Sequence, residues 1–122
     1  MADKLMIILL NTDPKNPSEL AAPFVQATVA AAMEFDVEIV LTGRAGELAQ
    51  RGVAEKISVK EQADKTVYDL IKNANEAGVV FKICTTTLDV WGDNLVPEVS
   101  ETVGDAYLIS EAMDDDTVTF TY

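Results

Sequence analysis

The stretch that decides the fold is KLMIILL, residues 4–10, which is apolar at every position after the lysine. Alternating apolar and polar residues would indicate a strand with one face in water, whereas a continuous apolar run indicates a strand buried on both faces. Both faces of a strand are covered when helices pack on each side of a parallel sheet. This run therefore predicts an α/β protein.

Further strand patterns follow along the chain and alternate with helical patterns. The expected strands are residues 37–42 (VEIVLT), 79–83 (VVFKI), 106–109 (AYLI) and 117–122 (TVTFTY), the last with the alternation of an edge strand. The expected helices are residues 18–33, 44–52, 59–78, 85–91 and 97–103. Strands alternating with helices at this spacing favour parallel β-α-β units, and five strands with helices on both faces give a small doubly wound sheet.

Several residues mark the ends of these helices. Ser18 is a suitable N-cap for the first helix, and Pro97 suits the first turn of the last one. Gly78 and Gly92 are expected to end the helices that precede them. The helix at 18–33 is rich in alanine and apolar on more than one face, so we expect the sheet to cover one side and a partner subunit the other.

Length and composition indicate one cytoplasmic domain, residues 1–122. The 122-residue chain has no apolar run of the roughly 18 to 20 residues that a membrane helix needs. Its N-terminus lacks the features of a signal peptide, and its single cysteine agrees with a reducing compartment. The formal charge of −12 repels phosphate backbones and anionic membranes, so we expect neither nucleic acid nor membrane as a partner.

The absence of histidine excludes Ser–His–Asp and Cys–His catalysis and removes the commonest metal ligand. The consecutive acids of MDDD, residues 113–116, are interpreted as a solvated turn, so no metal is expected. The glycine patterns of dinucleotide and P-loop sites are also absent, and no cofactor is expected. A flavin or nucleotide held by the loop at 11–18 remains an alternative, since that loop precedes a helix.

Cys84 is the candidate reactive residue. In open parallel sheets, ligands bind beyond the carboxyl ends of the strands, where the strand order reverses. If the order is 2-1-3-4-5, that place lies between the first and third strands, which are followed by Asn11 and Cys84. A helix that begins after the cysteine would stabilise its thiolate, the nucleophilic form. The competing interpretation is a buried and inert filler residue, which is common for a free cysteine.

Other residues could support such a site. Thr85 and Thr86 supply hydroxyl groups and a possible helix cap, and Lys82 would share the strand face of the cysteine. Arg44 follows the second strand and is a further candidate cation at this edge of the sheet. Trp91 is expected to form a wall of the site or to pack under a subunit interface.

This layout resembles the DsrE/DsrF-like sulfur-carrier family, which includes YchN-like and TusD-like proteins. The resemblance rests on KLMIILL, the small-residue helix after it, VVFKI ending at Cys84, the TTTLDVWGDNL segment and the tail AYLISEAMDDDTVTFTY. It implies a three-layer α/β/α flavodoxin-like sandwich with five mainly parallel strands in the order 2-1-3-4-5. Some members are labelled predicted peroxiredoxins, but the residues before Cys84 lack the Thr-x-x-Cys pattern of those enzymes.

The resemblance also implies a function. Cys84 would carry sulfur as a persulfide or thiosulfonate and pass it to a partner thiol, in a homotrimer or homohexamer that exchanges sulfur with rhodanese-like or TusA-like proteins. This chain has no second cysteine to resolve the persulfide. The alternatives are a non-catalytic oligomeric scaffold or regulatory subunit of a sulfur-relay complex, and a small-ligand binder.

Overall fold

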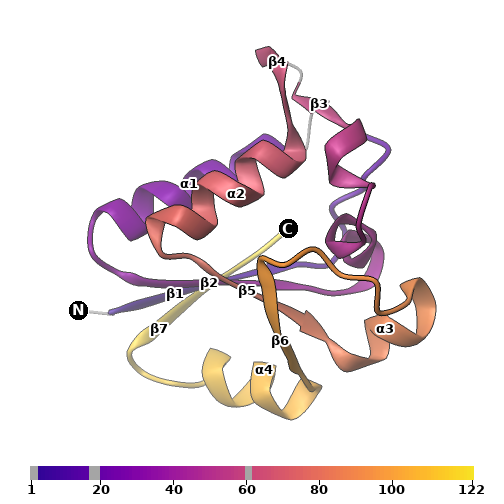
Figure 1. Ribbon diagram of the computed structural model, residues 1–122. Coiled ribbons are helices and arrows are strands. Elements are labelled where there is room, and N and C mark those ends of the chain that lie inside the picture. The colour runs from indigo at the N-terminus through magenta and orange to yellow at the C-terminus, as the bar shows by residue number, and fades with distance from the viewer. Residues whose placement is uncertain (1–2, 17–19, 60–61) are drawn as a thin grey trace.

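The computed structural model describes residues 3–16, 20–59 and 62–122 and has one five-stranded sheet at its centre (Figure 1). Its strands lie in the order β6 (Val99–Val103), β5 (Val80–Cys84), β2 (Asp36–Leu41), β1 (Lys4–Leu9) and β7 (Thr117–Thr121). Every neighbouring pair is parallel. The carboxyl ends of all five strands therefore meet at one edge.

Helices cover both faces of this sheet. α1 (Ala21–Ala32) and α2 (Val67–Ala77) lie side by side on one face, and α4 (Asp105–Ala112) lies on the other (Figure 1). α3 (Thr85–Trp91) follows β5 without a gap and ends at Gly92, whose φ of 98° terminates the helix. The predicted α/β class with helices on both faces of a parallel sheet is confirmed.

The order of the strands differs from the expected 2-1-3-4-5. Numbered along the chain, the five sheet strands lie in the order 4-3-2-1-5. β2 is buried from Val37 to Leu41 and pairs with both β1 and β5, as a central strand must. Starting from β1, the chain adds β2, β5 and β6 in turn, each beside the strand before it. Only the last connection, through α4, returns to the free edge of β1, where β7 pairs.

A helix and then a strand were predicted after Gly92, but the structure has a strand and then a helix there. Residues 97–103 form a turn followed by strand β6, not a helix, and the expected strand at 106–109 lies inside helix α4. VSETV has a valine at each end and three exposed polar residues between them, and it pairs with β5 over Phe81–Cys84 as the edge strand of the sheet. Pro97 lies in the turn before β6, where its missing N–H interrupts no ladder.

Residues 59–66 were expected in the helix that ends at Gly78, but that helix begins later. β3 (Ser58–Val59) and β4 (Gln62–Thr66) form a separate antiparallel pair. Thr66 then caps α2, because its hydroxyl accepts the N–H of Asp69 while the Asp69 carboxylate accepts the N–H of Thr66. Two 3-10 helices, η2 (Gly43–Ala49) and η3 (Ala54–Lys56), connect β2 to this region. The predicted N-cap Ser18 lies outside the described residues.

The hydrophobic core lies between the sheet and the pair α1 and α2. Phe24 of α1 and Phe81 of β5 meet there with ring centroids 6.2 Å apart. The opposite side of α1 stays exposed and apolar, as the sequence predicts: Val29 is 53% and Met33 62% exposed. No helix of the described residues is long and apolar enough to cross a membrane.

Candidate functional site at the carboxyl edge of the sheet

Cys84 is the last residue of β5 and the residue before α3, as predicted. Its side chain points to the α4 face of the sheet, because residues alternate along a strand and Ile83 belongs to the core on the other face. The thiol is 1% exposed, and it makes no side-chain hydrogen bond that would cap α3. The sulfur therefore lies at the sheet edge beside the first turn of α3 without capping the backbone of that helix.

Two side chains lie over the sulfur. Sγ of Cys84 lies 3.5 Å from Oγ1 of Thr86, and it donates to Oδ1 of Asp105 at 3.6 Å. Both partners are exposed residues, the first on α3 and the second at the start of α4. Cys84 is also not part of the core cluster beneath α1 and α2. The thiol is therefore buried just below the surface, under a thin polar cover.

A groove of about 420 Å³ runs beside this cover along the same edge. Thr86 borders both the groove and the sulfur, and Arg44 and Trp91 line the groove from the ends of β2 and α3. The Trp91 ring is fixed by a 2.9 Å bond from its Nε1 to the carbonyl of Gly43. The structure therefore brings three of the predicted residues together beside Cys84.

The remaining predicted residues lie along this edge or turn away from it. Thr85 is exposed in the first turn of α3, and Asn11 is exposed beyond β1. The guanidinium of Arg44 lies 3.4 Å from the Asp13 carboxylate, so its charge is already paired. β2 separates the ends of β1 and β5, so Asn11 and Cys84 do not flank one crevice as the predicted strand order required.

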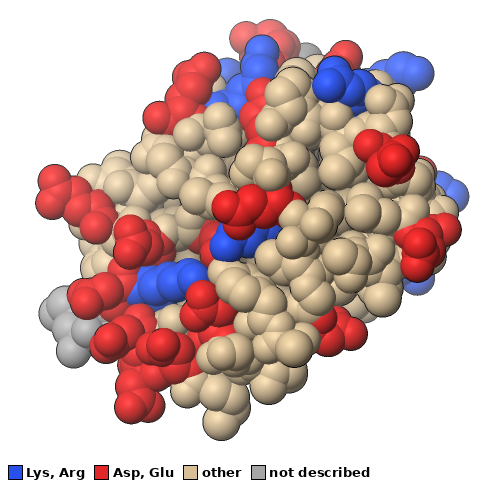
Figure 2. All heavy atoms as spheres, turned by 60° about the horizontal axis from the view of Figure 1, so that its bottom comes forward, with Lys and Arg blue, Asp and Glu red and all other residues tan. Residues whose placement is uncertain are grey.

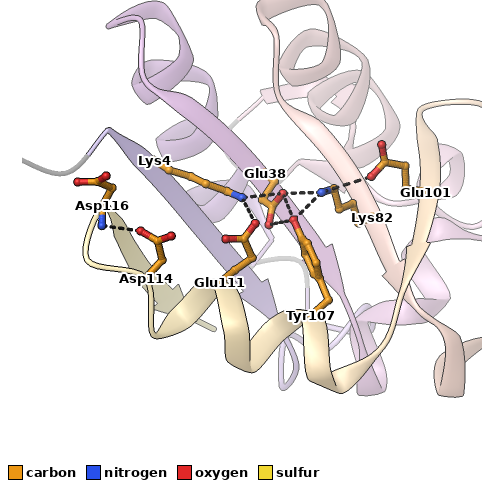
Figure 3. Close-up of polar contacts among 8 residues, drawn as sticks. All are labelled: Lys4, Glu38, Lys82, Glu101, Tyr107, Glu111, Asp114 and Asp116. Atoms are coloured by element: carbon orange, nitrogen blue, oxygen red, sulfur yellow. Dashed lines mark hydrogen bonds and ion pairs between the residues drawn. The ribbon is translucent and has the colours of Figure 1, made fainter.

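Lys82 shares the sheet face of Cys84 but contacts other groups. Its ammonium lies 2.8 Å from Glu38, 3.3 Å from Glu101 and 2.6 Å from the hydroxyl of Tyr107 (Figure 3). Burial opposes the charge on Lys82, but its hydrogen bonds with Glu38 and Tyr107 raise its pKa above the ordinary value. The ammonium is thus engaged beneath α4, and its described contacts do not include the sulfur.

These contacts form part of a polar cluster between the sheet and α4. The hydroxyl of Tyr107 donates to both carboxylate oxygens of Glu38 at 2.9 Å, and Lys4 binds Glu111 at 2.9 Å and Glu38 at 3.4 Å (Figure 3). Glu38 has a side chain only 5% exposed. Burial raises the pKa of the Tyr107 hydroxyl, and its bond to Glu38 raises it further. Figure 2 shows the outer surface of this side, where acidic side chains surround a few basic ones.

Sequence reasoning missed the carboxylates and the tyrosine of this region. Asp105 was overlooked because it precedes a segment that was expected to be a strand, which would not have turned back over Cys84. Glu38 interrupts an otherwise apolar strand, while Lys4 and Lys82 lie on the same face of the neighbouring strands. Opposite charges on one face of adjacent strands were the available signal.

The reactive group that this arrangement offers is the thiol of Cys84. Among the described residues, no group of three or more His, Cys, Asp or Glu side chains is placed to hold a metal ion. A cysteine next to a helix start and a solvent-exposed groove can accept and release a sulfur atom once its cover moves.

Comparison with known proteins gives three findings. The sequence model of the DsrE/DsrF-like family matches residues 4–117. A search of curated protein sequences finds no match. Among solved structures, the fold is similar to the crystal structure of the ychN protein from E. coli, with a TM-score of 0.74 and 19% identity over 98% of this chain and 99% of that one.

Proposed function

Because this chain belongs to the DsrE/DsrF-like family, we propose that it is a sulfur-relay protein in which Cys84 carries the transferred sulfur. The observation that carries the proposal is the position of the thiol. It ends β5 at the carboxyl edge of a parallel sheet, the edge beyond which open parallel sheets bind ligands, although the strand order reverses between β1 and β7 and not at β5. Its hydrogen-bond partners are side chains of exposed residues, unlike those of a filler residue in an apolar core.

The transfer is an exchange between sulfur atoms. The Cys84 thiolate attacks the outer sulfur of a donor persulfide, the S–S bond of the donor breaks, and the donor leaves as a thiolate. Cys84 then bears the persulfide, which a partner thiolate attacks in the same way to regenerate the free cysteine. Each step is redox neutral. Because the chain has no second cysteine, release requires a thiol from another molecule.

The proposed donors and acceptors are proteins of the rhodanese-like or TusA-like kind. The chain carries 21 acidic against 9 basic residues, so it attracts a basic partner surface and does not repel a neutral one. A homotrimer or homohexamer is proposed for the assembly. A groove of about 410 Å³ between α1 and the edge strand β7 supports it, since Val29, Met33 and Phe120 line that groove and are exposed in the single chain.

Intact-protein mass spectrometry tests the loading step. The folded protein and its Cys84→Ser variant are incubated with tetrathionate, whose attacked inner sulfur stays on the cysteine as a thiosulfonate while thiosulfate leaves. A mass gain that a reductant reverses and that Cys84→Ser does not show is the expected result. The same gain in the variant would rule out Cys84 as the carrier.

The burial of Cys84 at 1% exposure favours a second candidate, a scaffold or regulatory subunit in a sulfur-relay complex. In a scaffold the thiol would pack and not react. The same experiment separates the two functions, because a scaffold shows no mass gain while it still forms the oligomer.

A further inference from the structure

We infer that α4 is a lid over Cys84, latched by Asp105 on the sulfur and anchored to the sheet by Tyr107 and Glu111. The inference concerns the regulation of the proposed sulfur site and rests on that function for its role. Sulfur exchange requires the reacting atoms to approach to about 3–3.5 Å. Because Cys84 is 1% exposed beneath Thr86 and Asp105, no donor reaches it in the structure described.

α4 is held to the sheet by unusually little apolar contact. None of its residues is fully buried, whereas α1 and α2 each bury four. Ile109 on α4 is 66% exposed, and Met113, the residue after the helix, is 78% exposed. A helix of eight residues is not stable by itself in water, so its position depends on its contacts with the sheet.

Polar contacts join α4 to the sheet at two places. The Tyr107 hydroxyl lies between Glu38 and Lys82, and Glu111 binds Lys4 one turn later (Figure 3). Water can replace each of these bonds when the helix moves away, unlike apolar contacts, whose loss has no such compensation. The helix can therefore leave the sheet at a lower cost than α1 or α2.

Asp105 joins this helix to the reactive atom. It is the first residue of α4, and its carboxylate accepts the S–H of Cys84. The contact closes the cover over the sulfur from the side of α4, as Thr86 closes it from the side of α3. When the start of α4 lifts, this contact breaks and the sulfur becomes accessible to a donor.

The rate at which iodoacetamide labels Cys84 tests this inference. The reagent is small and uncharged, and intact mass reports the labelled fraction. The proteins are the wild type, Asp105→Asn, Tyr107→Phe, and Asp89→Asn as the matched control. Asp89 is an exposed acid on α3, so its variant has the same charge change as Asp105→Asn at a position away from the latch.

We expect the folded wild type to be labelled much more slowly than the urea-unfolded protein. Asp105→Asn and Tyr107→Phe should each raise the folded rate about tenfold, which corresponds to about 1.4 kcal/mol, the range of one hydrogen bond to a charged group. Asp89→Asn should leave the rate unchanged. Labelling through a local opening of α4 should also be insensitive to low urea, while labelling through global unfolding rises steeply.

Three results would overturn the lid: wild-type labelling as fast as in the unfolded protein, variant rates equal to the wild type, or a steep dependence on low urea. The failure of the proposed function can be distinguished from the failure of the lid. If Asp105→Asn labels quickly but tetrathionate loads none of the proteins, the lid stands and the sulfur-carrier function does not. If tetrathionate loads the wild type at the rate of the unfolded chain, the carrier stands and the lid does not.

Discussion

Replacing Glu38 with glutamine tests the polar cluster beneath α4 most sharply. The change keeps the shape of the side chain and removes its charge. Glu38 is the shared acceptor of the cluster, since it contacts Lys82 at 2.8 Å, Lys4 at 3.4 Å and the Tyr107 hydroxyl at 2.9 Å. Its side chain is 5% exposed and that of Lys82 is 12% exposed, so solvent screens this charge pair only weakly.

The expected loss in the free energy of unfolding follows from the ammonium groups of Lys4 and Lys82, which lose the carboxylate that they share. Removing one member of a buried ion pair costs about 3–5 kcal/mol, because the other charge stays buried without compensation. Glu101 still binds Lys82, and Glu111 still binds Lys4, so the loss falls at the lower end of this range. We expect Glu38→Gln to lower the free energy of unfolding by about 3 kcal/mol.

Urea unfolding followed by circular dichroism measures this loss, with all proteins at one concentration because assembly shifts apparent stability. At an m-value of about 1–3 kcal/mol/M the midpoint should fall by roughly 1–3 M. Glu76→Gln is the matched control, an exposed residue of α2 for which a change within about 0.5 kcal/mol is expected. If the two variants unfold at the same urea concentration, the cluster does not stabilise the fold as described.

Further predictions concern packing, acid stability and assembly. Gly46→Ala should cost about 1–3 kcal/mol in urea unfolding, because its Cβ would lie 2.0 Å from Cγ2 of Thr87 on α3; a loss below about 0.5 kcal/mol would contradict this packing. The bond from Lys4 lowers the pKa of Glu111, so its stabilisation is present above the ordinary carboxyl pKa and is lost as pH falls through the lowered one. Glu111→Gln should therefore lose less stability than the wild type in acid titrations, and an identical acid profile would refute the assignment. Val29→Asp, in the groove beside β7, should reduce the molar mass measured by light scattering to that of one chain, and an unchanged oligomer would place the interface elsewhere.

The strands nearest the core could be predicted from the sequence because their signals are local. A continuous apolar run identified β1, mainly apolar runs identified β2 and β5, and Gly92 marked the end of α3 correctly. Cys84 was placed at a strand end before a helix for the same reason. An apolar run reflects the burial of a strand on both faces, and a helix-ending glycine reflects the backbone conformation at one position. A few neighbouring residues are enough to show either signal.

The C-terminal third was less predictable because its apolar runs are short. Four apolar residues at 106–109 fit a strand as well as one turn of an amphipathic helix, and only contacts with the sheet decide between them. The strand order depends on which edge the last crossover reaches, which no local pattern specifies. The cover over Cys84 depends on Asp105, which lies 21 residues away in the chain and was visible only after α4 had been placed.

The central claim is that Cys84 carries sulfur between proteins, and unloading onto a partner tests it most directly. The protein is loaded with sulfane sulfur, separated from the donor and mixed with a TusA-like acceptor that has a free thiol, and the masses of both proteins are followed over time. The account predicts that the added sulfur leaves Cys84 and appears on the acceptor in equal amount. Sulfur that stays on Cys84, or that is lost without appearing on the acceptor, would contradict the claim.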